Sequence, residues 1–204
     1  MIVTKEELKQ VSGVDYYDGT ILHAPFAYKF FRNKTLPIGN IVLFRSPVKV
    51  ETTGMIDLED VLAKDYIYSN DMINMLWEIP NLDAFGAVAF QRLFNTQVAN
   101  ILHKYINKPI EVDGDDIMIH DEFEGSDKAL HTVGKASVSI AYSRNNTAMS
   151  HTAINVDAGP SAPGFAYSTK MTDEQCEQFM KDVIDCFYEM VDSIFLATRK
   201  LTTI

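Results

Sequence analysis

The sequence has little cysteine. Its 204 residues include two cysteines, Cys176 and Cys186, both in a segment with helical periodicity. A helix rises about 15 Å between these positions, which is too far for a disulfide. No Cys-x-x-Cys pair or neighbouring histidine completes a zinc site. We therefore expect two buried thiols in a reduced compartment.

Basic residues are also few. Lysine and arginine total 18 against 28 aspartates and glutamates, which gives a net charge of −10. This charge argues against nucleic acid as a partner and against docking on an anionic membrane surface. No window approaches the roughly 18 apolar residues of a membrane span, and the first residues lack an apolar signal region. We expect a cytoplasmic protein with no membrane partner, and a homo-oligomer remains open.

The common sequence devices for nucleotides, metals and serine nucleophiles are missing. The sequence contains no G-x-G-x-x-G after a strand, no G-x-x-x-x-G-K-[ST] loop, no H-E-x-x-H, no EF-hand loop and no G-x-S-x-G elbow. A nucleotide, if one binds, must be held by other residues.

Helical and strand-like patterns mix without a regular alternation, which predicts the α+β class. The apolar fraction of 47% fits one globular domain over residues 1–204. The predicted helices follow Thr4, Pro25 and Thr172 or span 55–64, 71–79 and 83–105. The predicted strands span 14–17 and 20–23 around an Asp-Gly turn, 40–44, and 116–120, and the polar segment 122–132 reads as a loop.

Apolar residues recur at helical spacing in the last helix, from Cys176 to Phe195. This stripe is typical of core packing. A groove for a partner helix is the alternative interpretation.

Two alternating segments carry the most functional information. Gly134–Tyr142 places Lys135, Ser137 and Ser139 on one face of a strand, and His151–Val156 places His151 and Asn155 on one face. If the segments pair with Ser137 opposite Asn155, these polar residues form one patch, and a slip by one residue would scatter them. An ordinary half-solvated hairpin is the alternative.

Five stretches together carry a resemblance to a known family. They are Met55–Val61, Gln91–Leu93, Gly114–Ile117, Lys135–Ala141 and His151–Val156. In this order and spacing they resemble an uncharacterised, mostly archaeal family of about this length, whose fold is similar to the biotin and lipoate protein ligases, in the class II aminoacyl-tRNA synthetase group. The resemblance implies one domain with a mixed or antiparallel central sheet flanked by helices.

The resemblance implies a role for Lys135. In lipoyl and octanoyl transferases and ligases, a lysine on a comparable strand contacts the acyl carbonyl or acyl-adenylate. Gly134-Lys135-Ala136 and Ile154-Asn155-Val156 look like the two strands concerned. The arginine and glycine-triplet strand of the ligases is not visible, its nearest counterpart being 45–50. The octanoyltransferases carry a nucleophilic cysteine directly after the Asn-Val strand. Residues 159–164 stand at that place here and contain no cysteine, which argues against a thioester mechanism.

The polar residues of the two segments allow several roles. Lys135 could neutralise a carboxylate or an acyl phosphate, and His151 could act as a base or a hydrogen-bond donor. Ser137, Ser139 and Asn155 could hold a ligand. A solvated lysine and ordinary satisfied polar residues are the alternatives, and no Ser-His-Asp arrangement can be assigned.

Charged residues outside these segments offer further contacts. Arg45 and Arg92 are candidate substrate contacts, although Arg92 could instead pair with a core carboxylate such as Glu78. Asp115 and Asp116 could bind a metal-nucleotide, or serve the turn after Gly114. Another acidic cluster consists of Asp57, Glu59 and Asp60. Its carboxylates could bind magnesium or an amine substrate, or could simply stabilise the N-terminus of a helix.

These observations support two main hypotheses. The first is an enzyme of acyl transfer or carboxylate activation that binds a small carboxylic acid, with ATP and Mg²⁺ as the cofactors that the resemblance allows. The second is a binding or regulatory module that keeps the fold without catalysis. A tRNA-related role is a third hypothesis, and the acidic charge argues against it.

Overall fold

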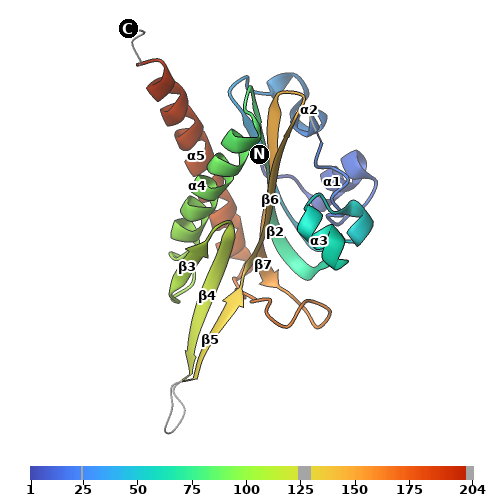
Figure 1. Ribbon diagram of the computed structural model, residues 1–204, viewed down its shortest axis with the longest axis vertical. Helices are drawn as coiled ribbons and strands as arrows, with labels where there is room; N and C mark the ends of the chain where they lie inside the picture. Colours follow the sequence, from blue (N-terminus) through green and yellow to red (C-terminus); the bar gives the residue numbers. More distant parts are fainter. Residues whose placement is uncertain (24, 124–129, 201–204) are drawn as a thin grey trace.

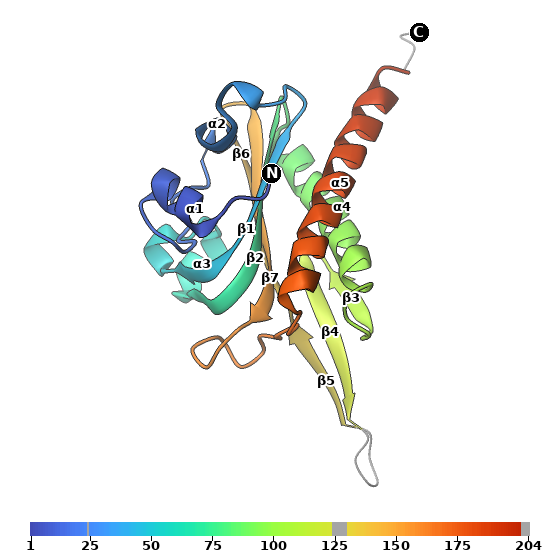
Figure 2. The same cartoon turned by 180° about the vertical axis from the view of Figure 1, so that it is seen from behind.

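The computed structural model describes residues 1–23, 25–123 and 130–200 and shows the predicted α+β class. A four-stranded antiparallel sheet, ordered β1-β2-β7-β6, stands at the centre. Helices α4 and α5 cover one face of this sheet, and α1, α2 and α3 lie on the other side (Figures 1 and 2). The strands are β1 (Asn40–Val50), β2 (Ile67–Pro80), β6 (Ser137–Arg144) and β7 (Thr147–Asp157). The helices are α1 (Lys5–Ser12), α2 (Phe26–Phe31), α3 (Leu58–Ala63), α4 (Ala84–Leu102) and α5 (Asp173–Thr198), with short 3₁₀ turns at Arg32–Lys34 and Thr52–Gly54.

A second antiparallel sheet, ordered β3-β4-β5, extends away from the first (Figure 1). It consists of β3 (Ile110–Asp113), β4 (Asp116–Phe123) and β5 (Leu130–Lys135). Ala136 joins the two sheets: its N–H donates to the carbonyl of Ile117 in β4, and its carbonyl accepts from the N–H of Asn155 in β7. The chain therefore changes sheet immediately after Lys135.

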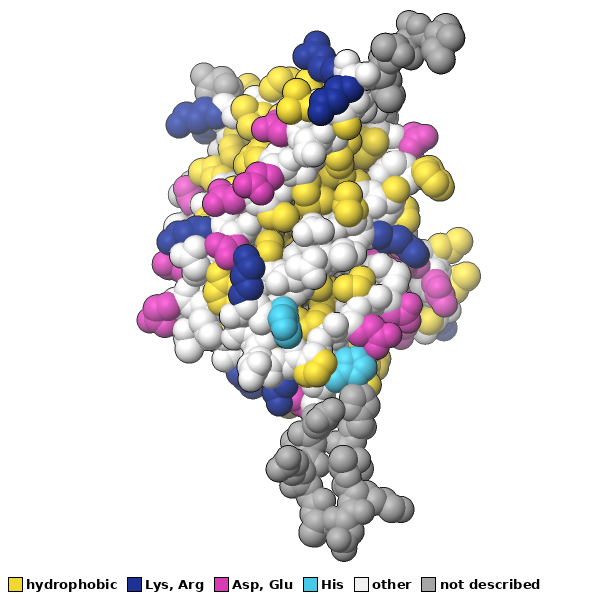
Figure 3. All heavy atoms as spheres, turned by 90° about the vertical axis from the view of Figure 1, so that its left-hand side faces the viewer, with side chains coloured by type: hydrophobic (Ala, Val, Ile, Leu, Met, Phe, Trp, Pro, Cys, Tyr) yellow, Lys and Arg dark blue, Asp and Glu magenta, His cyan; other side chains and the backbone are white. Residues whose placement is uncertain are grey.

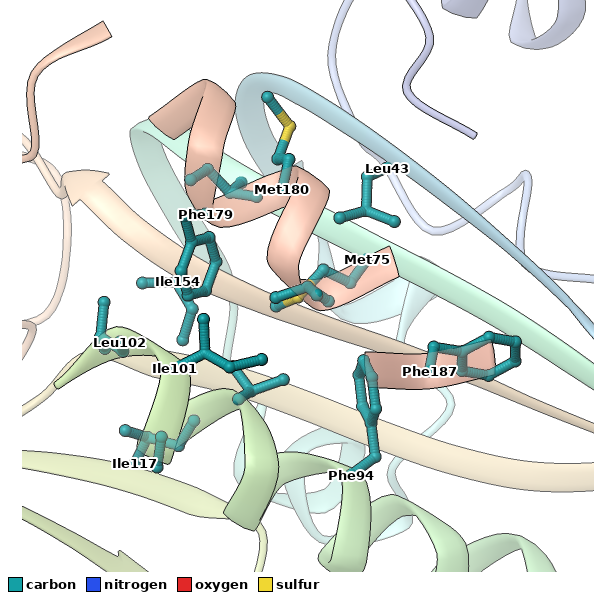
Figure 4. Close-up of a cluster of buried hydrophobic side chains, with 14 of the residues drawn as sticks. Leu43, Met75, Phe94, Ile101, Leu102, Ile117, Ile154, Phe179, Met180 and Phe187 are labelled. Atoms are coloured by element: carbon teal, nitrogen blue, oxygen red, sulfur yellow. The ribbon is translucent and has the colours of Figure 1, made fainter. Parts of the chain in front are cut away.

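Both faces of the central sheet are buried. On the α4/α5 face, Leu43, Met75 and Ile154 pack against Phe94 and Phe187 among others (Figure 4). On the opposite face, alternate residues of the same strands pack against α1 and α2. Members of this second cluster include Val42, Phe44, Met72, Leu8 and Phe26.

Three predicted helices begin at the residues that cap them. Thr4 and Glu7 form the predicted capping box of α1, and Thr172 and Gln175 form that of α5. Asp83 accepts a hydrogen bond from the N–H of Gly86 and starts α4. These caps need only neighbours in sequence, so the sequence alone could locate them.

The predicted helix over 71–79 is wrong, because these residues belong to β2. Most of this strand is buried on both faces, since Met72 packs on one side of the sheet and Ile73 on the other. A strand of this kind reads as a continuous apolar run and loses the alternation that identifies half-buried strands.

Three other predictions of strands and loops need correction. The hairpin around Asp18-Gly19 does not form; Tyr17 instead makes an isolated parallel bridge to Val48. The strand over 40–44 continues through Pro47, which lies at a register shift in the edge strand β1, where a missing N–H is tolerated. The predicted loop over 122–132 is partly strand at both ends, while residues 124–129 lie outside the described residues.

The segment Gly134–Tyr142 is not one strand. Ala136 separates Lys135 in β5 from Ser137 in β6. Ser137 pairs with Ile154, one residue away from the predicted partner Asn155. The slip puts Ser137 and Ser139 on the α4/α5 face of the sheet and His151 on the opposite face, so the predicted single polar patch does not form.

Apolar side chains also gather on the outer surface of α4 and α5 (Figure 3). They surround a groove of about 470 Å³. Ile194 and Phe195 are 42% and 44% exposed, so their predicted core packing is wrong. The reason is that α5 runs beyond the sheet at its C-terminal end (Figure 2). Within the described residues, no helix combines the length and the apolar character that crossing a membrane requires.

Candidate ligand-binding site

Two adjoining hollows open on the α3 side of the central sheet. The larger, which we call the lysine hollow, measures about 310 Å³ and is lined by Lys135 and by residues of β2, β6, β7, α3 and the segment 163–166. The smaller, which we call the histidine hollow, measures about 50 Å³ and is lined by His151 and Tyr17. The two share a wall that consists of Met55, Asp60, Ile67, Val138 and Ser139.

Lys135 is held firmly at the end of β5. Its N–H donates to the carbonyl of Phe165, and its carbonyl accepts from the N–H of Tyr167. Its ammonium forms an ion pair with Asp116, with Nζ 2.7 Å from Oδ1. The lysine side chain is 29% exposed and lines the hollow. The carboxylate of Asp116 already balances its charge.

Asn155 contributes an amide side chain without a partner in the described residues to the lysine hollow. The residue is 4% exposed, and its main chain is bonded to Ala136 and Thr169. Its side-chain amide makes no hydrogen bond within the described residues, although it lines the hollow. Among the described side chains, the fully buried polar atoms without a partner are Trp77 Nε1, Glu78 Oε2 and Ser150 Oγ, so the Asn155 amide is reached by water from the hollow and a ligand can replace that water.

The hydroxyls of the two predicted serines already have protein partners. Ser137 Oγ accepts from the N–H of Ile117 at 2.8 Å, which ties β6 to β4. Ser139 Oγ accepts from Gln91 Nε2 at 2.8 Å and from Asn95 Nδ2 at 3.0 Å, both on α4. Both residues border the lysine hollow, but their hydroxyls are directed to the α4/α5 face of the sheet, where these bonds join β6 to β4 and α4.

His151 is buried and its tautomer follows from its partner. Asn74 Nδ2 donates to the carbonyl of Met72, which can only accept, so Asn74 Oδ1 must face His151 Nε2 at 2.9 Å. Nε2 therefore donates, and Nδ1 carries a lone pair. Burial lowers the pKa of His151 to about 3, so the ring is neutral near pH 7. The Tyr17 ring stacks on it with centroids 3.8 Å apart.

Arg45 lies in an ion-pair network and lines neither hollow. Its guanidinium binds Asp71 of β2, with Nε 2.8 Å from Oδ2, and Asp173 at the start of α5, with Nη1 2.6 Å from Oδ1. The hydrogen bonds to Asp71 raise the pKa of Arg45 above its ordinary value. The predicted substrate contact is therefore replaced by a structural link among β1, β2 and α5.

We expect the Arg45→Met variant to lose roughly 1–3 kcal/mol of unfolding free energy, because the half-buried Asp71 loses its charged donor. Urea denaturation measures this loss. Lys49→Met is the matched control on the same strand, since its exposed pair with Glu51 is 3.5 Å long; we expect a change below about 0.5 kcal/mol. Equal losses in the two variants would contradict the structural role of Arg45.

The remaining predicted contacts also lie outside the two hollows. Arg92 is exposed on α4, close to Gly114. Asp116 is occupied by Lys135, and Asp115 Oδ2 accepts from Gln91 Nε2 at 3.3 Å. Burial, and after it the charge of Asp116, raises the pKa of Asp115. No group of three or more potential metal-ligating side chains occurs in the described part of the chain, so the predicted metal pair has no third protein ligand of this kind there.

Comparison with known proteins shows the family to which this chain belongs. Residues 7–202 match a family described as a domain of unknown function, DUF366. The chain belongs to this family. Nothing among the curated proteins matches it.

Solved structures share the fold of this DUF366 chain. A protein of unknown function from Pyrococcus horikoshi is 23% identical, with a TM-score of 0.75 and 93% of each chain covered. Biotin protein ligase from Aquifex aeolicus, solved with biotin and ATP, is 10% identical, with a TM-score of 0.52 and coverages of 87% of this chain and 68% of the ligase. P. falciparum LipL1, solved with lipoate, is 13% identical, with a TM-score of 0.50 and coverages of 78% and 52%. The predicted resemblance to the biotin and lipoate ligases is thereby confirmed for the fold.

Sequence reasoning missed several polar residues in and around the candidate site of this DUF366 chain. Asn74 interrupts an apolar run, and Gln91 and Asn95 lie one helical turn apart on the buried face of α4. Polar residues at otherwise apolar positions were the signal that could have found them. Asp65 gave no such signal, because it follows α3 in an exposed stretch and joins the hollow only through the fold.

Proposed function

We propose that the lysine hollow binds the carboxylate or acyl group of a small acid, and that the protein activates or transfers that group. One observation carries the proposal: the Lys135 ammonium and the unpaired amide of Asn155 line the same hollow where the two sheets meet. A carboxylate accepts hydrogen bonds from both groups. The two neighbouring structures from P. falciparum and Aquifex aeolicus were solved with lipoate and with biotin, which are carboxylic acids of this general kind.

The chemistry assigned to Lys135 is electrostatic. In acyl transfer a nucleophile adds to the acyl carbon and negative charge develops on the acyl oxygen; the carbonyl then re-forms as the bond to the leaving group breaks and that group departs with the electron pair. A fixed ammonium at that oxygen stabilises the charge. His151 is a weak base because its pKa is about 3, so its Nδ1 is better suited to accept a hydrogen bond that orients a ligand.

A nucleoside triphosphate does not fit the charges of the lysine hollow. Within the described residues, its charged lining consists of Lys135, Asp60 and Asp65, and the lysine is already paired with Asp116. A polyphosphate would meet two carboxylates there without a free cation. We therefore assign no residue of this hollow to the phosphates of ATP.

We expect the Lys135→Met variant to lose about 10²–10³-fold in turnover, the usual cost of removing one donor to a developing oxyanion. Hydroxylamine trapping of acyl groups from a panel of activated acids measures transfer, and pyrophosphate release with the free acids and ATP measures activation. Lys108→Met is the matched control, because Lys108 forms a pair of the same length, 2.7 Å, with Asp121 of β4 but lines neither hollow. Equal turnover in both variants, or none in the wild type with any acid, would contradict the enzymatic proposal.

A binding protein without turnover is the second candidate. The ion pair with Asp116 favours it, because a neutralised lysine suits recognition of a ligand better than stabilisation of a growing charge. Thermal stabilisation by an acid that is never consumed would support this candidate.

A further inference from the structure

The lysine hollow carries charges of both signs. Lys135 and Asn155 line it, and so do Asp60 and Asp65. Neither carboxylate forms an ion pair or a side-chain hydrogen bond within the described residues. The Lys135 charge is felt at Asp60, where it lowers the pKa against the larger opposing effects of burial and of Asp57 and Asp65.

The balance of charge in this hollow is negative. Lys135 is compensated by Asp116 at 2.7 Å, which leaves the charges of Asp60 and Asp65 without a compensating cation. Two carboxylates at a partly enclosed wall attract a cationic group and repel a second anion. An acid with no other charge would be bound by Lys135 and would gain nothing from Asp60 and Asp65.

Apolar side chains make up much of the remaining lining. They are Met55, Ile67, Met72 and Val138, and Tyr66 and Phe165 add aromatic rings. Tyr66 and Phe165 are 52% and 61% exposed, so both rings can cover a ligand or contact an ammonium group. A volume of about 310 Å³ lies at the lower limit for ligand pockets and suits a small molecule.

We infer that the lysine hollow binds a small amino carboxylate, with its carboxylate or acyl oxygen at Lys135 and Asn155, its apolar carbon chain across Met55 and Val138, and its ammonium at Asp60 and Asp65. This inference rests on the proposed function and adds the second charge of the substrate. The unpaired, nine-tenths buried Asn155 supports a ligand at this place independently of the acidic residues.

Isothermal titration with three matched probes tests the inference. The probes are ε-aminohexanoate, which has both charges, hexanoate, which has the carboxylate alone, and hexylamine, which has the ammonium alone. Shorter ω-amino acids give the length dependence, and EDTA excludes a metal bridge to Asp60 and Asp65. We expect ε-aminohexanoate or a shorter homologue to bind at least about tenfold more tightly than either singly charged probe.

Variants separate this inference from the proposed function. We expect the doubly substituted Asp60→Asn, Asp65→Asn protein to bind the amino carboxylate at least about tenfold more weakly, and hexanoate equally or more tightly. Glu59→Gln, an exposed position of α3 that lines neither hollow, is the control and is expected to leave both affinities unchanged. Circular dichroism confirms that the variants are folded.

Two different failures can be distinguished. If hexanoate binds as tightly as the amino carboxylates and the aspartate variants change neither affinity, the inference is overturned while the carboxylate site stands. If no probe binds, or if Lys135→Met leaves hexanoate affinity unchanged, the inference and the proposed carboxylate site fail together.

Discussion

We expect the Phe94→Ala variant to lose about 3–5 kcal/mol of unfolding free energy. Phe94 is fully buried on α4, and its ring lies 6.1 Å from the ring of Phe187 and 6.5 Å from that of Phe90, measured between centroids. Figure 4 shows Phe94 and Phe187 in the cluster between the helices and the sheet. Alanine would leave a cavity where α4, α5 and β2 meet, and surrounding side chains close such cavities only in part.

The matched control for Phe94 is on the same helix. Phe85 is 85% exposed, so Phe85→Ala makes the same chemical change without opening a cavity, and we expect an effect within about 0.5 kcal/mol. Urea titrations followed by tryptophan fluorescence measure both values, with Trp77 in the core as the probe. A small loss for Phe94→Ala, similar to that of the control, would show that this cluster does not carry the stability of the domain.

The second large effect is the pH dependence that His151 gives to stability. The pKa of His151 is about 3 in the folded protein against an ordinary value of 6.5. Below pH about 6.5 the unfolded chain takes up a proton on this ring, and the folded protein does not do so until about pH 3. The contribution of the neutral His151 ring to the free energy of unfolding is therefore fully present above pH 6.5. It decreases as the pH is lowered, by roughly 2 kcal/mol at pH 5.

The His151→Gln variant tests this pH dependence, because glutamine does not titrate. We expect the variant to be less stable than the wild type at pH 7, and the difference between the two to narrow by roughly 2 kcal/mol at pH 5. Unfolding by urea at both pH values measures the difference in stability between the two proteins. The pH dependence that comes from all other titratable groups is the same in both and cancels in this difference. His103→Gln, at an exposed position, is the control. Parallel stability curves for wild type and His151→Gln would contradict a neutral buried ring.

Only part of the candidate site could be predicted from the sequence. Lys135 and Asn155 were singled out from their segments and do line one hollow. The predicted patch failed because Ser137 pairs with Ile154, and a slip by one residue moves every side chain to the other face. Local alternation is the same for both registers, so the pattern could not choose between them.

Contacts distant in sequence account for the other misses. Arg45 looked like a free anion contact, yet its partners Asp71 and Asp173 lie on two other elements. Asp65 joins the hollow because α3 and β2 bring it opposite the strand of Asn155. No periodicity within one segment contains this information.

The order of residues alone was enough to indicate the α+β class and the starts of α1, α4 and α5, because caps and side-chain periods depend on near neighbours. The alternating segment and the family resemblance together were enough to name Lys135 as a candidate site residue. The tertiary structure decided which of the polar residues meet in a cavity. That outcome depends on the strand register and on the change of sheet at Ala136, where hydrogen bonds to Ile117 and Asn155 join segments far apart in the chain. A lysine, an unpaired amide and two aspartates come together there only after both sheets have formed.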